Sequence, residues 1–218
     1  MDMQKMQNLV GEAVRDADLH PEEIPAIDLY LDQITSLTQG KLKESSEHYH
    51  DRILTKTMIN NYSKDGLIAP TKGKKYSKEH ILQMLLVYSM KNTLSIGEIK
   101  RILQHVYGLP EYSDALLEDV YLRFLEIKEM ERDEIWDGVD CFVERSKLDV
   151  SDEADFLTLI LGLASLSSYY KSIVQVLLEE HYSDRSAERE REENEAKLQR
   201  KLEKKAAKTK RKESEAAE

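Results

Sequence analysis

Residues 54–103 read LTKTMINNYSKDGLIAPTKGKKYSKEHILQMLLVYSMKNTLSIGEIKRIL, and this stretch decides the fold. Its apolar side chains recur every three or four residues, which is typical of amphipathic helices. Thr55 precedes the first of these helices and Gly66 follows it, so the sequence predicts a helix over 55–65 with Thr55 as its N-cap. We expect three apolar side chains of this part to lie in the core, those of Met58, Ile59 and Leu67.

A compact basic turn follows at 71–76 (TKGKKY), between two short extended pieces. Ser77 is the predicted N-cap of the next helix. Ser95 and Glu98 have the spacing of a capping box, in which each side chain bonds the backbone N–H of the other residue, and they open a third helix. The stretch therefore predicts three short helices with a basic turn after the first.

Outside this stretch the apolar spacing is also helical nearly everywhere. The chain has 8 Gly and 4 Pro among 218 residues, which disfavours a turn-rich β fold. We therefore predict an all-α protein with a small wing-like turn. The further predicted helices cover the first 20 residues, about 26–39 with Gly40 as the stop, 114–131, 133–145 and 153–181.

The order of these elements resembles the winged helix-turn-helix of the MerR (mercury-resistance regulator) family, over about 50 residues. The matching positions are Leu54-Thr55 at the helix start, Tyr62 at a usual Tyr, Gly66-Leu67 at the exit, and Lys74 and Tyr76 at the Arg-x-Tyr of the wing. Lys64 stands at a common Arg, whereas Asn60 and Asn61 stand where Arg and Tyr are usual. The family joins its two motif helices by a tight turn, and here about fourteen residues lie between Gly40 and Thr55.

The chain resembles still more closely a bacterial family known as domain of unknown function 1836. The shared motifs are IPAIDLYLDQ, LTKTMINNYSKDGLI-P, KKYSKEHI and LSIGEIK, in that order, and the likeness covers roughly residues 24–180. This resemblance implies a helix-turn-helix and no established activity.

Charge is distributed unevenly along the chain. The net charge of the whole is −10, but residues 41–105 carry 12 basic and 6 acidic groups, and residues 106–184 carry 6 and 19. Polyanion binding, if it occurs, therefore belongs to the basic segment. The predicted domains are an N-terminal segment (1–23), a winged helix-turn-helix (24–108), an acidic helical domain for dimerisation or partner binding (109–183), and a charged, flexible or helical tail (184–218).

The basic segment contains the candidate contacts to double-stranded DNA. Asn side chains on a helix make bidentate contacts to adenine in the major groove. Lysines on a compact turn neutralise phosphates, and a helix N-terminus takes one more. The candidates are Thr55, Lys56, Thr57, Asn60, Asn61, Lys64, Lys72, Lys74, Lys75 and Tyr76. The alternative interpretation is that the two asparagines are a helix C-terminal feature and the lysines a solvated loop.

Catalytic and metal sites lack a sequence signal. Nucleotide-binding, serine-hydrolase and zinc-protease motifs are absent, so we expect no enzyme, no catalytic residue and no cofactor. His48 and His50 have no third ligand at an evident spacing, which favours a solvated loop over a metal site. Cys141 is the one cysteine, and we expect it to be a small buried side chain. A single cysteine and the absence of a signal peptide fit a cytoplasmic protein.

The 153–181 helix is apolar on nearly every side over its first half. Its uninterrupted apolar part is too short to span a membrane, and Lys171 and Gln175 interrupt the rest. We therefore expect it to be buried on most sides, inside the protein or against a second copy in a homodimer, with no membrane contact.

Two functions from different classes follow. The first is a DNA-binding transcriptional regulator that acts by stoichiometric binding. The second is a protein-interaction module on a winged-helix fold, which binds a basic partner through its acidic helical domain. A third possibility, a sensor of a small molecule or protein effector, needs a pocket among the helices of 114–181.

Overall fold

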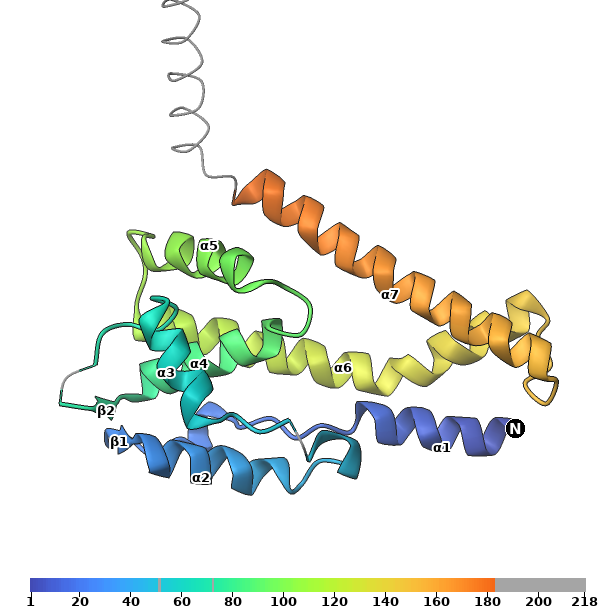
Figure 1. Cartoon of the computed structure of the whole chain (residues 1–218), viewed down its shortest axis with the longest axis horizontal. Coiled ribbons are helices and arrows are strands. Elements are labelled where there is room, and N and C mark those ends of the chain that lie inside the picture. Colours follow the sequence, from blue (N-terminus) through green and yellow to red (C-terminus); the bar gives the residue numbers. More distant parts are fainter. Residues whose placement is uncertain (51, 72, 183–218) are drawn as a thin grey trace, which may run out of the picture. The chain divides into compact units, whose positions relative to one another are not determined.

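The computed structural model describes residues 1–50, 52–71 and 73–182, and these residues are mostly helical, which confirms the all-α class (Figure 1). The chain divides into two compact units, Met1–Leu177 and Leu178–Glu218. The predicted tail at 184–218 lies outside the described residues. The elements in chain order are α1 (Met3–Val14), η1 (Pro21–Glu23), β1 (Leu29–Tyr30), α2 (Leu31–Leu42), η2 (Glu47–Tyr49), α3 (Lys56–Lys64), β2 (Lys75–Tyr76), α4 (Lys78–Met90), α5 (Ile96–Tyr107), α6 (Asp114–Ser146) and α7 (Glu153–His181).

The predicted caps begin α3, α4 and α5. The hydroxyl of Thr55 accepts the backbone N–H of Met58 at 3.2 Å, which begins α3. The carboxylate of Glu98 accepts the backbone N–H of Ser95 at 2.7 Å, which completes the capping box of α5. Gly66 follows α3 with φ +72°, a conformation that costs Gly little. These boundaries follow from local hydrogen bonding, so the sequence predicted them correctly.

The helix predicted from about 26 to 39 with Gly40 as its stop is wrong at both ends, because α2 covers Leu31–Leu42. Leu29 and Tyr30 are extended instead and pair antiparallel with Tyr76 and Lys75 of β2. This pairing takes the start of the predicted helix into a two-stranded sheet, which lies beside the start of α2 (Figure 1). Gly40 is inside α2, where a glycine costs only about 1 kcal/mol relative to alanine.

The two helices predicted at 114–131 and 133–145 are one continuous helix, α6. The residues across the expected junction, Glu131, Arg132 and Asp133, include neither Gly nor Pro. Their charged side chains reach solvent from a helix, so a polar run does not end one.

The core between the short helices contains two of the three predicted side chains. Ile59 and Leu67 are fully buried. Met58 is only half-buried, because the buried stripe of α3 is narrow and consists of Ile59 and Tyr62.

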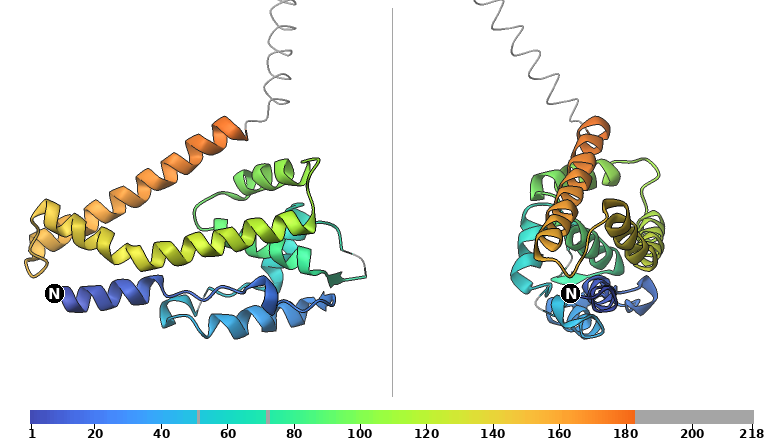
Figure 2. Two further views of the ribbon diagram at one scale, coloured as in Figure 1. Left: turned by 180° about the vertical axis from the view of Figure 1, so that it is seen from behind. Right: turned by 90° about the vertical axis from the view of Figure 1, so that its right-hand side faces the viewer.

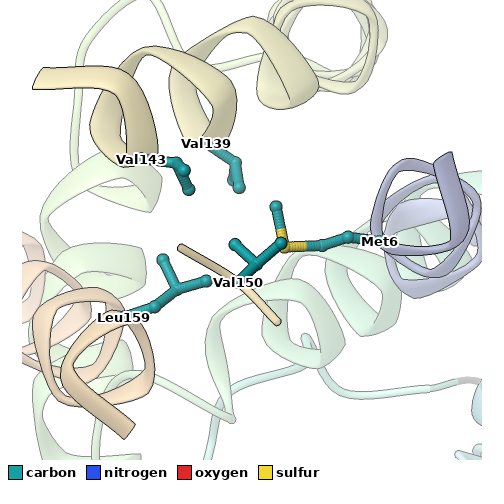
Figure 3. Packing of buried hydrophobic residues seen from close by; sticks show 5 residues of the cluster. All are labelled: Met6, Val139, Val143, Val150 and Leu159. Atoms are coloured by element: carbon teal, nitrogen blue, oxygen red, sulfur yellow. The ribbon is translucent and has the colours of Figure 1, made fainter. Parts of the chain in front are cut away.

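A second apolar cluster joins α1, α6 and α7 (Figure 3). Its buried members are Met6, Val139, Val143, Val150 and Leu159. Figures 1 and 2 place α1 alongside the second half of α6, as this cluster requires.

An ionic cluster connects the segment after α1 to the middle of α6. The side chains of Lys128 and Arg132 both contact Asp16 and Asp18, at 2.7 Å for Lys128 Nζ–Asp18 Oδ1 and 2.9 Å for Arg132 Nη2–Asp16 Oδ1. These four side chains are only 17–26% exposed. We call this group of four residues the clasp.

The expectation that α7 is buried on most sides inside the protein is wrong for this chain alone. Only 6% of its most apolar 18-residue window is buried. By length and composition, α7 is the one helix among the described residues that is long and apolar enough to cross a membrane.

Candidate nucleic-acid interface

Helix α3 presents one polar face to solvent. Its side chains Thr57, Asn60, Asn61 and Lys64 are exposed, whereas Ile59 and Tyr62 hold the opposite side in the core. The helix has no acidic residue between its N-cap and Lys64. Exposed asparagine amides and lysines are groups that bind base edges and phosphates.

The basic turn before β2 presents a second set of cations. Lys74 and Lys75 are exposed. Gly73 and Lys74 both have a positive φ, +64° for Gly73 and +61° for Lys74. Two successive positive φ values are typical of a tight hairpin turn, in which glycine is favoured over lysine. Lys72 belongs to the same predicted set and lies outside the described residues.

The start of α2 lies between these two sets. Lys56, the first residue of α3, forms an ion pair with Asp32. Tyr30 lies two residues before Asp32, and the centroid of its ring is 5.2 Å from Nζ of Lys75. Because Tyr30 and Asp32 are neighbours, the structure brings the start of α3 and the basic turn to the same end of α2.

Tyr76 is the predicted site residue that lies apart from this exposed set. Its side chain is 8% exposed and packs edge-on against His80. The ring therefore holds the base of the turn against α4, and the exposed set consists of the other described candidates.

Sequence reasoning missed the buried amide that supports this region. Gln83 on α4 is 1% exposed, accepts the backbone N–H of Ala69 at 2.8 Å, and donates to Tyr112 at 3.3 Å. Tyr112 donates in turn to Glu79 at 2.5 Å. The network holds the chain that leaves α3 against α4. A polar residue within the apolar run HILQMLLV was the available signal.

The hydrogen-bonded Tyr112 of this network predicts that the fold loses stability in alkali. Burial, with the hydrogen bond to Glu79, raises the pKa of Tyr112 to about 12, and burial also raises the pKa of Tyr121. A raised pKa in the folded state means that the stabilisation is complete below the unfolded value near 10 and is lost as pH rises towards 12. We expect the melting temperature to fall over this range, and to fall less steeply in Tyr112→Phe. Tyr30→Phe, at an exposed ring, is the control and should leave the pH dependence unchanged; an equal change in both would contradict the assignment.

The two histidines and the cysteine that the sequence singled out do not form a metal site among the described residues. His50 Nε2 lies 3.2 Å from the carbonyl oxygen of Ser45, and His48 lies beside Arg52. The described residues hold no group of three His, Cys, Asp or Glu side chains placed to bind a metal. Cys141 is exposed, so the expectation of a buried thiol is wrong. The reason is that α7 leaves a groove along α6 at this point.

Comparison with known proteins gives one match. Residues 19–124 match the model of a family described as a domain of unknown function (DUF1836), which confirms the resemblance for those residues. No curated protein and no solved structure matches the chain. The matched segment includes α3, the basic turn and the first part of α6, and the clasp residues lie just outside both of its ends.

Proposed function

We propose that residues 19–124, the segment that carries the DUF1836 family match, form a MerR-like winged helix-turn-helix that binds double-stranded DNA, and that the chain is a stoichiometric transcriptional regulator. The observation that carries this proposal is the exposed polar face of α3, with Asn60, Asn61 and Lys64, beside a basic turn. In this arrangement α3 enters the major groove and the turn contacts the flanking backbone.

The two sets of side chains have different tasks in this proposal. Asn60 and Asn61 contact base edges, because an amide makes a bidentate pair with adenine. Lys64, Lys74 and Lys75 contact phosphates, which fixes position without reading sequence. Thr57 and the N-terminus of α3 bind one more phosphate, because unpaired backbone N–H groups point out of a helix start.

The connection between α2 and α3 departs from the tight turn of the MerR family. It runs from Lys43 to Thr55 and includes the short helix η2. Helices α2 and α3 are nevertheless in contact, so the longer connection does not separate them.

The test is a selection of genomic fragments by the full-length protein, followed by titration of the enriched fragments at low salt. We expect enrichment of a common site and tighter binding to it than to random duplex. If nothing is enriched and random DNA binds more weakly than about 1 mM, the regulator proposal is wrong, because non-specific binding by DNA-binding proteins is typically tighter than that.

A protein-interaction module is the second candidate, and the surface of α6 favours it. Six acidic side chains are exposed along the middle of α6, between residues 126 and 137, those of Glu126, Glu129, Glu131, Asp133, Glu134 and Asp137. Such a face fits a basic protein partner and repels DNA. Failure of the DNA selection would support this candidate.

Asp32 is expected to weaken DNA binding by holding Lys56. In Asp32→Asn the lysine is free to contact a phosphate, so affinity for random duplex should rise by about 3- to 10-fold at low salt, with a steeper salt dependence. Electrophoretic mobility shifts measure both quantities. The matched control is Asp119→Asn, which makes the same charge change in an exposed ion pair on α6. Equal gains in both variants would mean that net charge alone is responsible.

A further inference from the structure

Helix α7 carries a regular apolar seam along its length. Apolar residues recur at alternating spacings of three and four, and they are Phe156, Leu159, Leu163, Leu166, Tyr170, Ile173 and Leu177. An average period of 3.5 residues keeps one stripe facing a neighbouring helix over many turns, as in coiled coils. The seam therefore indicates packing against another helix along the whole of this stretch.

The first half of the seam is satisfied within the chain. Leu159 is 1% exposed, and Phe156 and Leu163 pack against the cluster that includes Val139 of α6. Gly162 lies beside them with its Cα against the ring of Phe142, where a Cβ would come within 2.4 Å of the ring. The absence of a side chain there lets α7 approach α6 closely.

The second half of the same seam has no such cover. Leu166, Tyr170, Ile173 and Leu177 are 42–63% exposed. On the opposite side of α7, Gln175 donates a hydrogen bond to Glu98 at the start of α5. The uncovered stripe is therefore the side of α7 that faces away from that contact.

A groove connects the covered and uncovered halves. It has a volume of about 660 Å³, and its apolar lining comes from both α6 and α7, with Ile135, Val139, Phe142, Leu163, Leu166 and Tyr170 among the lining residues. A helix that packed on the uncovered seam would also contact this groove and the exposed Cys141 beside it.

We propose that a second copy of this chain covers the seam, with the second half of each α7 packed against the α7 and the groove of its partner in an isologous dimer. The seam continues an intrachain helix contact, so the occupant it fits is another apolar helix of the same period, and α7 itself is one. Seven large apolar side chains in the second half of α7 are 39–68% exposed, those of Leu166, Tyr169, Tyr170, Ile173, Val174, Val176 and Leu177. At about 100 Å² each they offer on the order of 700 Å², to which the groove adds, and this is close to the ~800 Å² that each partner contributes to a stable interface.

A lipid bilayer fits the same surface less well. Lys171 lies in the middle of the apolar stretch, where a charge opposes insertion. Crossing a membrane would also pull Phe156, Leu159 and Leu163 out of the cluster with α6. A helix lying on a membrane surface typically has a basic polar face, and between 156 and 177 α7 has one lysine and no arginine.

The charge of this part of the chain predicts how salt affects the dimer. Residues 106–184 carry a net charge of −13, so two copies that meet through α6 and α7 repel each other. Added salt screens repulsion between exposed charges. The dimer should therefore become tighter with salt, in contrast to a complex with DNA, which becomes weaker.

The test is sedimentation of the full-length protein with a matched pair of variants. The wild type should sediment at twice the 25.3 kDa of one chain at high micromolar concentration, and more completely at about 500 mM than at about 50 mM NaCl. Leu177→Glu, on the seam and 63% exposed, should weaken the dimer at least tenfold. The control Leu161→Glu makes the same change at 61% exposure on the other side of α7 and should weaken it less than threefold. Both side chains are largely exposed in one chain, so both variants should keep the wild-type circular dichroism.

Three results would overturn the proposal. The first is a wild type that remains monomeric at this concentration. The second is equal weakening by the two variants, which would exclude the seam as the interface. The third is cosedimentation of a monomer with phosphatidylcholine vesicles, which would assign α7 to a lipid surface. None of these measurements involves DNA, so the proposal and the regulator function fail independently.

Discussion

Arg132→Met is expected to lower the free energy of unfolding by about 1.5–3 kcal/mol. Breaking a fully buried ion pair costs about 3–5 kcal/mol, and the clasp side chains keep up to a quarter of their surface exposed, which reduces the loss. The variant leaves the carboxylates of Asp16 and Asp18 with Lys128 as their one remaining partner in the clasp. For a chain of this size the loss corresponds to a fall of roughly 5–10 °C in the melting temperature, which calorimetry measures.

Arg123→Met is the matched control for this measurement. Arg123 lies on the same helix and pairs with Asp119 at 3.1 Å, but its side chain is 72% exposed. Exposed pairs at this spacing contribute about 0.3–0.5 kcal/mol, so the melting temperature should fall by no more than about 2 °C. Equal losses in the two variants would show that the clasp adds nothing beyond an ordinary surface pair.

The clasp also explains how the matched segment is held at its ends. The hydroxyl of Tyr121 donates to the carbonyl of Leu19 at 3.2 Å, within the segment 19–124. Asp18 and Lys128 then join the chain immediately outside both ends. An N-terminal segment and the middle of α6 thus stabilise the proposed DNA-binding part from outside it.

Asn60→Ala and the pair Lys74→Ala with Lys75→Ala are expected to affect DNA binding in different ways. Asn60→Ala should cost about 1–3 kcal/mol on the selected site, roughly 5- to 150-fold in affinity, and little on random duplex, because a bidentate base contact carries sequence information. Each lysine variant should weaken binding to both duplexes. Each should also reduce the slope of log K against log salt by about 0.9, because one phosphate contact is lost.

The three substitutions share a control for folding. All three side chains are exposed, so the melting temperature should stay within about 2 °C of the wild type. If Asn60→Ala lowers the affinity for random DNA as much as the affinity for the selected site, the proposal that α3 reads the bases is wrong. If the slope of log K against log salt is unchanged in both lysine variants, the basic turn does not contact the DNA backbone.

Local chemistry was sufficient for the short helices around the basic turn. Thr55, Ser77 and Ser95 each act on backbone N–H groups within three residues, and Gly66 acts on its own φ angle, so neighbouring residues determine these boundaries. The apolar stripe of α3 likewise predicted that Ile59 would be buried. The same local pattern placed Asn60 and Lys64 on a helix, and their exposure follows from the stripe opposite them.

Contacts between distant residues decided the rest. The pairing of β1 with β2 joins residues more than 40 positions apart and converts a predicted helix start into a strand. The ion pair between Asp32 and Lys56 depends on the packing of α2 against α3. The spacing of apolar residues indicates which of them share a face of a helix. Whether that face is buried depends on a second element that packs against it. For this reason the residue spacing of α7 defines its seam but not which part of the seam is buried. Only the packing of α7 against α6 determines that the first half of the seam is covered and the second half is exposed. The same packing leaves Cys141 exposed beside the groove.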